Sequence, residues 1–344
     1  MVILAIDTSC DETSVAITNG RKILSNVIYS QVLLHKKWGG VVPSIAKRAH
    51  EERINFVVES ACHPRGGGDP GLLNSIDYIA VTQGPGLAVA LEVGIKKAKE
   101  LAKKYQKKLI SVNHLEGHIY SAFVQNSQGN PKSDFKFPYL ALIISGGHTE
   151  FVIFENHLKY KIIGQTLDDA AGEALDKAAK LLGLGYPGGP VLERLAYEVD
   201  NVDNHNFPRP MLRSKDLNFS FSGLKTSFYY FLKKNPNKTS EVKLLASSFQ
   251  EAVFDTLIKK TEMAIKQTGI NRLIIGGGVI ANSRLRNLMR ALVKKYHGEV
   301  LFPTYKYLTG DNAAMIGIVA GYKAGKGLFV KDDDQLDRVP RMSL

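Results

Sequence analysis

Residues 2–18, VILAIDTSCDETSVAIT, decide the fold class of this 344-residue chain. Two apolar runs flank a polar turn rich in Ser, Thr and Asp, a pattern that predicts a strand, a tight turn and a second strand. The same order returns at residues 140–154, LALIISGGHTEFVIF, where the turn is Ser-Gly-Gly. A turn of small and polar residues presents backbone N–H groups, which suit a phosphate. The chain therefore contains one phosphate-compatible hairpin twice.

The repetition continues after each hairpin. A third strand and a helix come next, then a strand that ends in a Gly-rich turn before a helix, and finally another strand and helix. The paired stretches are 22–30 with 158–166, 76–94 with 272–289, and 108–122 with 299–321. We therefore expect an α/β protein in which one β-β-β-α-β-α-β-α half is used twice. Such ribonuclease-H-like halves resemble the actin/hsp70/sugar-kinase (ASKHA) superfold, whose two lobes bind a nucleotide in a central cleft.

Length and duplication together predict two lobes. We expect residues 1–112 in the first lobe and residues 113–321 in the second, with residues 322–344 packing back on the first. The second lobe should carry a basic and aromatic insertion near 204–243. The Gly and Pro content of residues 63–75, HPRGGGDPGLLNS, predicts a surface loop.

Composition limits the functional class. A net charge of +12 favours a polyanionic partner such as nucleic acid. No apolar stretch is long enough to cross a membrane, and the chain begins on a strand pattern rather than on a signal peptide. The two cysteines, Cys10 and Cys62, argue against a disulfide framework. We therefore expect a cytoplasmic protein with no membrane partner.

Basic residues concentrate in two places. Residues 95–108 hold seven lysines and one glutamate, which favours a solvated helix face over a binding patch. Residues 204–243 hold eight Lys or Arg against two acidic residues, together with seven aromatic residues. That mixture suits RNA, because phosphates need cations and bases need stacking surfaces. The competing interpretation is that several of these aromatic side chains belong to the core.

Two histidines lie four residues apart in the stretch NHLEGHIYSA at residues 113–122. On a helix, His114 and His118 share one face. The spacing indicates a metal site, although histidine pairs at this spacing also occur without one. Glu116 lies on roughly the opposite side, so the helix lacks the base of a zinc-protease H-E-x-x-H motif. Any third ligand must come from elsewhere in the chain.

The chain also contains a partial match to a dinucleotide-binding motif. Gly276, Gly278 and Ala281 fit G-x-G-x-x-A after a strand, but Glu299 lies at the wrong end of the next strand for ribose recognition. No P-loop sequence G-x-x-x-x-G-K-[ST] occurs. We therefore expect neither Rossmann-type nor P-loop nucleotide binding.

The motifs of the chain, taken in order, resemble the TsaD (Gcp) family of tRNA adenosine threonylcarbamoyltransferases, most closely its bacterial branch. The resemblance covers residues 3 to about 323 and rests on DTSCDETSVAI, GGVVPSIAKRAH, GPGL, NHLEGHIYSA, SGGHTEF, DDAAGEALDKAAKLLGLGYPGGP, FSFSGLKT, GGGVIANSRLR and DNAAMIG. The chain departs from the family pattern at residues 63–75 and at LEVGIKKAKE, residues 91–100. Neither departure touches a motif that should carry chemistry.

The resemblance implies a reaction. The family transfers the threonylcarbamoyl group from threonylcarbamoyl-adenylate to the exocyclic amine of the adenosine 3′ of the anticodon. The acceptors are tRNAs that read codons beginning with A, and AMP is released. Bacterial members of the family carry out this t(6)A modification together with a smaller TsaB-type paralogue and a TsaE-type P-loop ATPase.

The resemblance also implies site residues. His114, His118 and Asp311 match the family's ligands for one divalent metal ion, iron or zinc, which positions and polarises the threonylcarbamoyl group. The residues that match substrate contacts are Ile143, Ile144, Ser145, Gly146 and Gly147 at the acyl phosphate, Asp176 at the ribose hydroxyls, and Gly189 and Asn282 at the nucleotide. Asp176 could instead be a helix-surface residue, and Asn282 also suits a helix N-cap.

Other polar residues near these motifs have more than one interpretation. Asp11 and Glu12 could repel a phosphate, serve as base toward the amine or steer catalysis across the cleft, and Glu12 is our candidate catalytic base. Lys225 is expected either to meet a phosphate or the tRNA, or to form a buried ion pair. His148 is either structural or close to the substrate.

Three other functions compete with the transferase. The position of Glu116 argues against a metalloprotease. Release of phosphate from ATP without a tRNA product would favour a kinase or ATPase of the same superfold. RNA binding whose chemistry is unchanged by loss of His114 would favour an RNA-binding scaffold.

Overall fold

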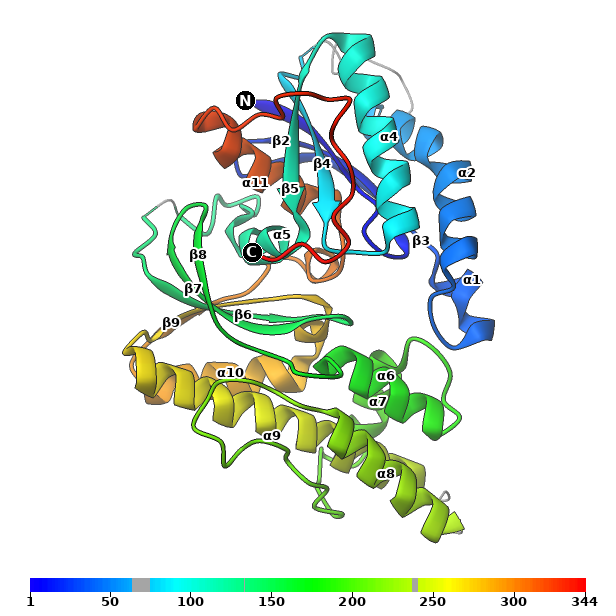
Figure 1. Cartoon of the computed structure of the whole chain (residues 1–344). Helices are drawn as coiled ribbons and strands as arrows, with labels where there is room; N and C mark the ends of the chain where they lie inside the picture. Colours follow the sequence, from blue (N-terminus) through cyan, green and yellow to red (C-terminus); the bar gives the residue numbers. More distant parts are fainter. Residues whose placement is uncertain (64–74, 133, 237–240) are drawn as a thin grey trace. The chain divides into compact units, whose positions relative to one another are not determined.

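The computed structural model describes residues 1–63, 75–132, 134–236 and 241–344 (Figure 1). The surface loop expected at 63–75 lies almost entirely outside these residues.

The chain forms two compact units. The first contains residues 1–135 and 303–344, and the second contains residues 136–302. The sequence placed the boundaries at 112/113 and 321/322. The chain therefore leaves the first unit later than expected, after residue 135, and returns to it earlier than expected, at residue 303. The cause is the last long helix of the chain, which packs against the first sheet rather than the second.

The first unit is built on a five-stranded sheet of order β3-β2-β1-β4-β5. β1 and β2 form the antiparallel hairpin expected at residues 2–18, with Ala5 opposite Ala16. β4 and β5 extend the sheet in parallel. Its strands are β1 (Val2–Asp7), β2 (Glu12–Asn19), β3 (Lys22–Ser30), β4 (Tyr78–Gly84) and β5 (Lys108–Asn113).

The second unit repeats this topology. Its sheet order is β10-β9-β6-β7-β8. Read from β8 to β10, this is the order of the first sheet with each strand replaced by its counterpart. The hairpin β6–β7 is antiparallel and β9 pairs with β6 in parallel. The predicted duplication is confirmed. The strands are β6 (Tyr139–Ile144), β7 (Thr149–Asn156), β8 (Lys159–Gln165), β9 (Arg272–Gly276) and β10 (Glu299–Leu301).

Helices cover both faces of the first sheet. α2 and α4 pack together on one face and α11 lies on the other (Figure 1). The helical elements of this unit are α1 (Val32–His35), η1 (Lys36–Trp38), α2 (Pro43–Cys62), α4 (Ala88–Tyr105), α5 (His114–Tyr120), η2 (Ser121–Phe123), η5 (Lys306–Leu308) and α11 (Ala313–Gly325). A sheet covered on both sides explains why β1 is apolar along almost its whole length instead of alternating.

The helices of the second unit share one large apolar core with its sheet. They are α6 (Ala171–Leu181), α7 (Gly188–Tyr197), α8 (Ser222–Lys234), α9 (Val242–Thr268), η4 (Gly278–Ala281) and α10 (Ser283–Lys295). None of the helices within the described ranges is both long and apolar enough to cross a membrane.

The buried helix α11 fixes the position of the residues that precede it. All of its residues from Ala313 to Ala320 are buried, as expected for a helix that is apolar on every side. Gly317 allows the close approach to the sheet, because a Cβ atom there would lie 2.6 Å from Oγ1 of Thr18 in β2. α11 also packs against α5.

The C-terminal segment returns across the first unit. The N–H of Val330 donates to the carbonyl of Leu109 at 2.9 Å, and the N–H of Val339 donates to the carbonyl of Gln83 at 2.9 Å. Near its end, the carbonyl of Ser343 accepts a hydrogen bond from Nδ2 of Asn113 at 3.0 Å. The segment thus runs from the start of β5 to the ends of β4 and β5, next to the N-cap of α5.

Two glycines of α11 should respond in opposite ways to replacement by alanine. Gly317→Ala places a methyl group against the stiff, buried Thr18, so we expect a net loss of about 1–2 kcal/mol of unfolding free energy. A Cβ at Gly321 meets only Ile3 Cδ1, at 3.9 Å. Gly321→Ala should therefore stabilise the protein by about 0.5–1 kcal/mol through helix propensity. Urea denaturation followed by circular dichroism measures both, and stabilisation by Gly317→Ala would contradict the close packing.

Candidate metal centre

A capping box fixes the start of α5. The side chain of Asn113 accepts a hydrogen bond from the N–H of Leu115 at 2.8 Å, and the carboxylate of Glu116 accepts one from the N–H of Asn113 at 3.3 Å. Glu116 also pairs with Lys323 of α11 at 2.8 Å. Glu116 is thus a structural residue, in agreement with the expectation that it is not the base of a protease motif.

The structure brings His114, His118 and Asp311 together. The two imidazole rings lie one helical turn apart, with centroids separated by 4.6 Å. Asp311 precedes α11, whose N-cap Asn312 accepts a hydrogen bond from the N–H of Met315. Oδ1 of Asp311 lies 3.3 Å from Nε2 of His114 and 3.4 Å from Nε2 of His118. In the described part of the chain, this is the one group of three or more potential metal ligands.

The geometry and the hydrogen bonding of these residues fit a bound metal ion. Two ligands placed about 2.1 Å from a tetrahedral zinc ion lie roughly 3.4 Å apart, close to the separations observed. His118 is fully buried, and neither of its ring nitrogens has a hydrogen-bond partner within the described residues. A buried polar atom without a partner is costly. Two imidazoles and a carboxylate form a donor set that suits iron or zinc.

The charges in this cluster are strongly coupled. Burial alone would lower the pKa of His114, but the carboxylates of Asp311 and Asp7 outweigh burial and raise it to about 10. Burial opposes ionisation of Asp311, yet His114 and His118 hold its pKa well below the usual range. Burial lowers the pKa of His118, which keeps this imidazole neutral and able to coordinate a cation.

Asp7 is a member of this environment that sequence reasoning missed. One carboxylate oxygen accepts hydrogen bonds from the hydroxyl of Thr82 at 2.8 Å and from the N–H of Ser9 at 3.2 Å. The other oxygen lies 3.7 Å from Nδ1 of His114. A carboxylate behind a ligating histidine orients the ring and raises its basicity. The available signal was an acidic residue that ends a strand buried from Ile3 onward.

Glu12 lies on the same unit as this cluster. Its carboxylate accepts a hydrogen bond from the hydroxyl of Ser30 at 3.2 Å. Burial, with additional contributions from Asp11 and Asp311, raises the pKa of Glu12 well above the usual range. A carboxylate with a raised pKa accepts a proton more readily than an ordinary one. Cys10, close by, and Cys62 are both free, as expected.

The predicted phosphate turn of the second unit is open to solvent. The N–H of Ser145 donates to the carbonyl of His148 at 2.8 Å, which closes the β6–β7 turn. Gly146 and Gly147 are exposed, and a Cβ at either would meet nothing within 4 Å. The side chains of Ile143 and Ile144 are fully buried. These two isoleucines can therefore offer a ligand only their backbone, and their contact with the acyl phosphate stays a prediction.

The other predicted substrate residues of this unit have structural partners. Oδ1 of Asp176 accepts hydrogen bonds from the N–H groups of Gly188 at 2.7 Å and Gly189 at 3.2 Å, at the start of α7. The side chain of Asn282 accepts from the N–H of Leu285 at 3.1 Å, which confirms the N-cap prediction, and donates to Gln250 at 3.0 Å. Asp176 is therefore a capping residue rather than a free surface carboxylate.

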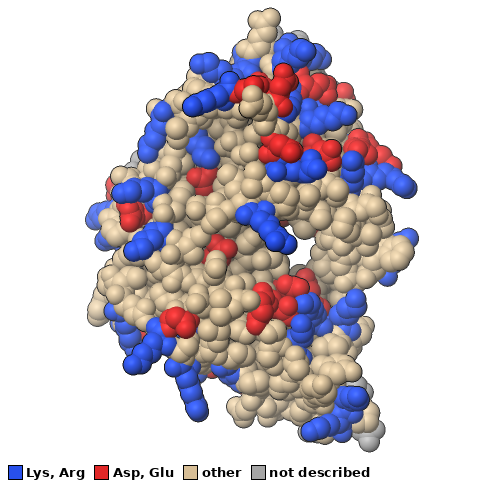
Figure 2. Space-filling view, in the orientation of Figure 1, with Lys and Arg blue, Asp and Glu red and all other residues tan. Residues whose placement is uncertain are grey.

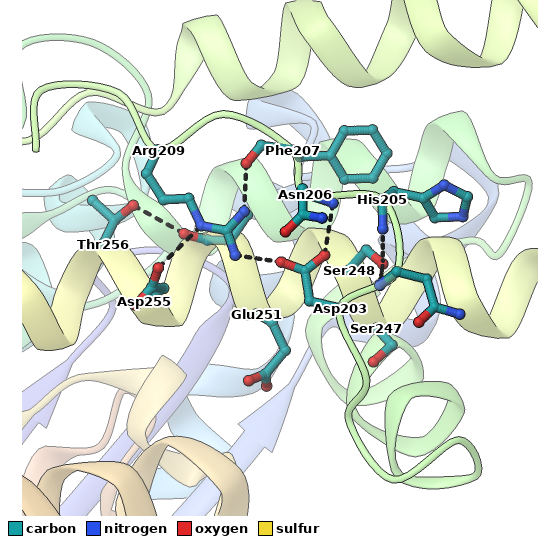
Figure 3. Close-up of polar contacts among 12 residues, drawn as sticks. Asp203, His205, Asn206, Phe207, Arg209, Ser247, Ser248, Glu251, Asp255 and Thr256 are labelled. Atoms are coloured by element: carbon teal, nitrogen blue, oxygen red, sulfur yellow. Dashed lines mark hydrogen bonds and ion pairs between the residues drawn. The ribbon is translucent and has the colours of Figure 1, made fainter.

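Part of the basic and aromatic insertion is used internally, whereas Tyr229 and Tyr230 are exposed. Arg209 forms ion pairs with Asp203 and Asp255 (Figure 3). The Ser248 hydroxyl accepts a hydrogen bond from the N–H of His205 at 3.3 Å. Lys225 pairs with Asp169 at 2.8 Å, so the ion-pair interpretation holds, although Lys225 is 30% exposed rather than buried. Among the aromatic residues, four are buried: Phe207, Phe219, Phe221 and Phe228.

The lysine-rich helix α4 is not a continuous basic patch. Acidic and basic side chains alternate over α2 and α4 on the face shown in Figure 2. Lys97 pairs with Glu100 at 2.8 Å, and Lys47 of α2 pairs with Glu92 at 3.5 Å. This pattern agrees with the interpretation of residues 95–108 as a solvated helix face.

Removal of the Asp176 carboxylate should weaken α7 whether or not a ligand is bound. Asp176→Ala leaves two N–H groups without their acceptor and should cost about 1 kcal/mol. Asp176→Asn keeps the accepting oxygen and should retain most of the stability. Thermal unfolding without nucleotide measures the difference, and an Ala variant as stable as the wild type would refute the capping role.

Comparisons with known proteins agree with this fold and site. A family model described as tRNA N6-adenosine threonylcarbamoyltransferase matches residues 22–318. A protein of that name from Kosmotoga olearia is 46% identical over 346 residues, covering 100% of this chain and 99% of the relative. Another from Geotalea uraniireducens is 48% identical over 343 residues, covering 99% of this chain and 96% of the relative.

Solved structures at low identity support the fold alone. HypF from T. kodakarensis matches with a TM-score of 0.62 and 14% identity, over 96% of this chain and 48% of that chain. An activator of 2-hydroxyisocaproyl-CoA dehydratase from Clostridium difficile matches with a TM-score of 0.52 and 15% identity, over 95% and 97% of the two chains. The predicted ASKHA fold class is confirmed. From the extent of the family match and the identity along its full length, the chain belongs to the TsaD family, the tRNA N6-adenosine threonylcarbamoyltransferases.

Proposed function

We propose that this chain transfers the threonylcarbamoyl group from threonylcarbamoyl-adenylate to N6 of the adenosine 3′ of the anticodon, in tRNAs that read codons beginning with A. A new bond forms between N6 and the carbamoyl carbon, the bond from that carbon to the phosphate oxygen breaks, and AMP leaves. The amine gives up one proton. The observation that carries the proposal is the full-length identity of 46–48% to relatives of this name, together with the buried His-His-Asp cluster.

We propose His114, His118 and Asp311 as the ligands of one divalent ion, iron or zinc. A metal with two imidazole and one carboxylate ligands retains open positions and can polarise a carbonyl as a Lewis acid. An adenine amine is a weak nucleophile, because its lone pair is delocalised into the ring. The reaction therefore depends on a polarised carbonyl and on a good leaving group, which the mixed anhydride supplies.

The protein's own residues have separate tasks in this proposal. Asp7 holds the ring of His114 in place. Glu12 is the candidate base for the amine proton, because its raised pKa matches that task. In the second unit, the exposed backbone of Gly146 and Gly147 suits the acyl phosphate. Asp176, Gly189 and Asn282 are proposed as nucleoside contacts in addition to their structural roles.

The same proposal extends to partners and location. We expect the chain to act in the cytoplasm, where its tRNA substrate is. We also expect a smaller TsaB-type paralogue and a TsaE-type P-loop ATPase to take part, as in the bacterial members that the sequence resembles.

Transfer of labelled threonine to unmodified tRNA tests the function. Wild-type chain, with the adenylate-forming enzyme and the partner proteins, should label the tRNA. His114→Ala should reduce the initial rate by at least about 100-fold, because a lost ligand affects both the metal and the chemistry. His63→Ala, at the end of α2 and outside the cluster, should retain wild-type activity. Absence of label with wild type, when a known enzyme labels the same tRNA, would refute the proposal.

The same mixture separates the competing functions. Phosphate release from ATP without labelled tRNA would indicate an ATPase of the same superfold. Undiminished labelling by the His114→Ala variant would show that the proposed metal site is not needed for the reaction. Cleavage of a peptide substrate that stops when a chelator is added would indicate a metalloprotease.

Metal affinity should depend on pH in a definite direction. Because the carboxylates raise the pKa of His114 to about 10, a proton occupies this imidazole at neutral pH and a cation must displace it. Zinc affinity should therefore fall about tenfold for each pH unit below that pKa. Competition titration with a chromophoric chelator measures this slope. An affinity that is flat between pH 6 and pH 9 would show that His114 is already neutral.

A further inference from the structure

Residues 31–40, which we call the Trp38 turn, expose the single tryptophan of the chain. The side chain of Trp38 is 55% exposed, and that of Leu33 is 82% exposed. A tryptophan is the side chain that most favours burial or an interface, so its exposure on a folded surface indicates a binding role. The turn consists of α1, η1 and the two glycines that follow.

Two buried polar side chains anchor the Trp38 turn to the first unit. Gln31 and His35 are fully buried, and Nε2 of His35 lies 3.1 Å from Oε1 of Gln31. Nδ1 of His35 accepts a hydrogen bond from the N–H of Val42 at 3.3 Å. Burial lowers the pKa of His35, which suits a neutral ring that donates from one nitrogen and accepts at the other. The indole is thus presented by an anchored turn.

Two lysines give the exposed indole a basic setting. Lys36 and Lys37 are exposed, and Nζ of Lys37 lies 5.3 Å from the ring centroid of Trp38. Neither ammonium group makes an ion pair with any described residue. No acidic residue occurs anywhere between Glu12 and Glu51. This absence of acids distinguishes the turn from α4, where Lys97 pairs with Glu100.

The turn begins directly beside the candidate base. The hydroxyl of Ser30 donates to Glu12, and the N–H of Gln31 donates to the carbonyl of Asp11 at 2.9 Å. Trp38 comes seven positions after Gln31, a distance that in helical form spans only about 10 Å. A polymer bound at Trp38 can therefore reach the neighbourhood of Glu12 within a few nucleotides.

We propose that the Trp38 turn binds the tRNA substrate, with the indole stacked on an unpaired base and Lys36 and Lys37 on the adjacent phosphates. Exposed aromatic rings flanked by cations are how proteins hold single-stranded RNA. A protein partner fits less well, because two lysines without counter-charges would have to be desolvated, and lysine is depleted in protein interfaces. This inference rests on the proposed function, since it takes tRNA as the substrate.

The single tryptophan reports on its own binding site. Full-length protein is titrated with unmodified tRNA while indole emission is followed, with excitation at the red edge of the indole absorption, where RNA absorbs only weakly. We expect saturable quenching. Iodide should quench Trp38 in the free protein and much less in the complex. Free N-acetyltryptophanamide mixed with the Trp38→Phe variant corrects for absorption by the RNA.

Matched variants test the two components separately. Filter binding should show about 5- to 150-fold weaker tRNA binding for Trp38→Ala, and a much smaller change for Trp38→Phe, which keeps an aromatic ring. The double variant Lys36→Ala/Lys37→Ala should lower the slope of log affinity against log salt by roughly 1.4. The control is Lys103→Ala/Lys104→Ala on α4, where Lys104 lies at the same 5.3 Å from Tyr105. Its salt slope should change much less.

The outcomes distinguish this inference from the proposed function. If wild type labels tRNA but all Trp38-turn variants bind tRNA with wild-type affinity and salt slope, the inference fails and the function stands. If Trp38 emission responds only to an added protein partner, the turn is a protein interface and the inference also fails. If wild type quenches on tRNA yet transfers nothing, the turn binds RNA and the proposed function fails. All substituted side chains are exposed, so unchanged melting temperatures should confirm that the variants fold.

Discussion

The packing of α11 against the first sheet is the constraint on which the candidate site depends. The chain leaves the first unit after residue 135, builds the second unit, and returns at residue 303. Since α11 is apolar on every side, it must be covered completely, and the sheet and α5 provide that cover. This contact carries Asp311 to the two histidines of α5, which lie nearly 200 residues earlier in the sequence. The close approach at Gly317 fixes the depth of the helix, and the Glu116–Lys323 pair fixes α5 against it.

Burial then determines the chemistry of the cluster. Asp311 lies 3.3 Å from His114 and 3.4 Å from His118. Burial of these three ionisable groups penalises a net charge on the cluster. Asp311 remains ionised because imidazoles flank it, and His114 holds a proton because carboxylates flank it. Nδ1 of His118 has no hydrogen-bond partner among the described residues, and its Nε2 lies 3.4 Å from Oδ1 of Asp311. A divalent cation would satisfy every one of these groups at once, which a proton cannot do.

The sequence predicted the repeated β-β-β hairpin sheets because alternation of strand and turn residues is a local signal, and the two sheet orders are equivalent. His114 and His118 were visible as a pair at helical spacing, whereas Asp311 came only from the family resemblance. Asp7 was missed although it ends a buried strand, because its role depends on His114, a neighbour in space and not in sequence. The lobe boundary at 112/113 differs from that of the compact units for a related reason, since the packing of α5 against α11 is a long-range contact that no local pattern reports. The buried side chains of Ile143 and Ile144 show that a family motif names positions without telling backbone from side chain.

The discontinuity of the first unit also has a consequence for biosynthesis. Residues 136–302 are contiguous and can fold as soon as they have been synthesised, whereas the first sheet is made early and lacks α11 until the last part of the chain appears. In that interval one apolar face of the nascent sheet is uncovered, the condition in which chains aggregate or recruit chaperones. The order of synthesis therefore makes the second unit the first to mature. Slower translation between residue 302 and α11 should lengthen the period during which the nascent chain is vulnerable.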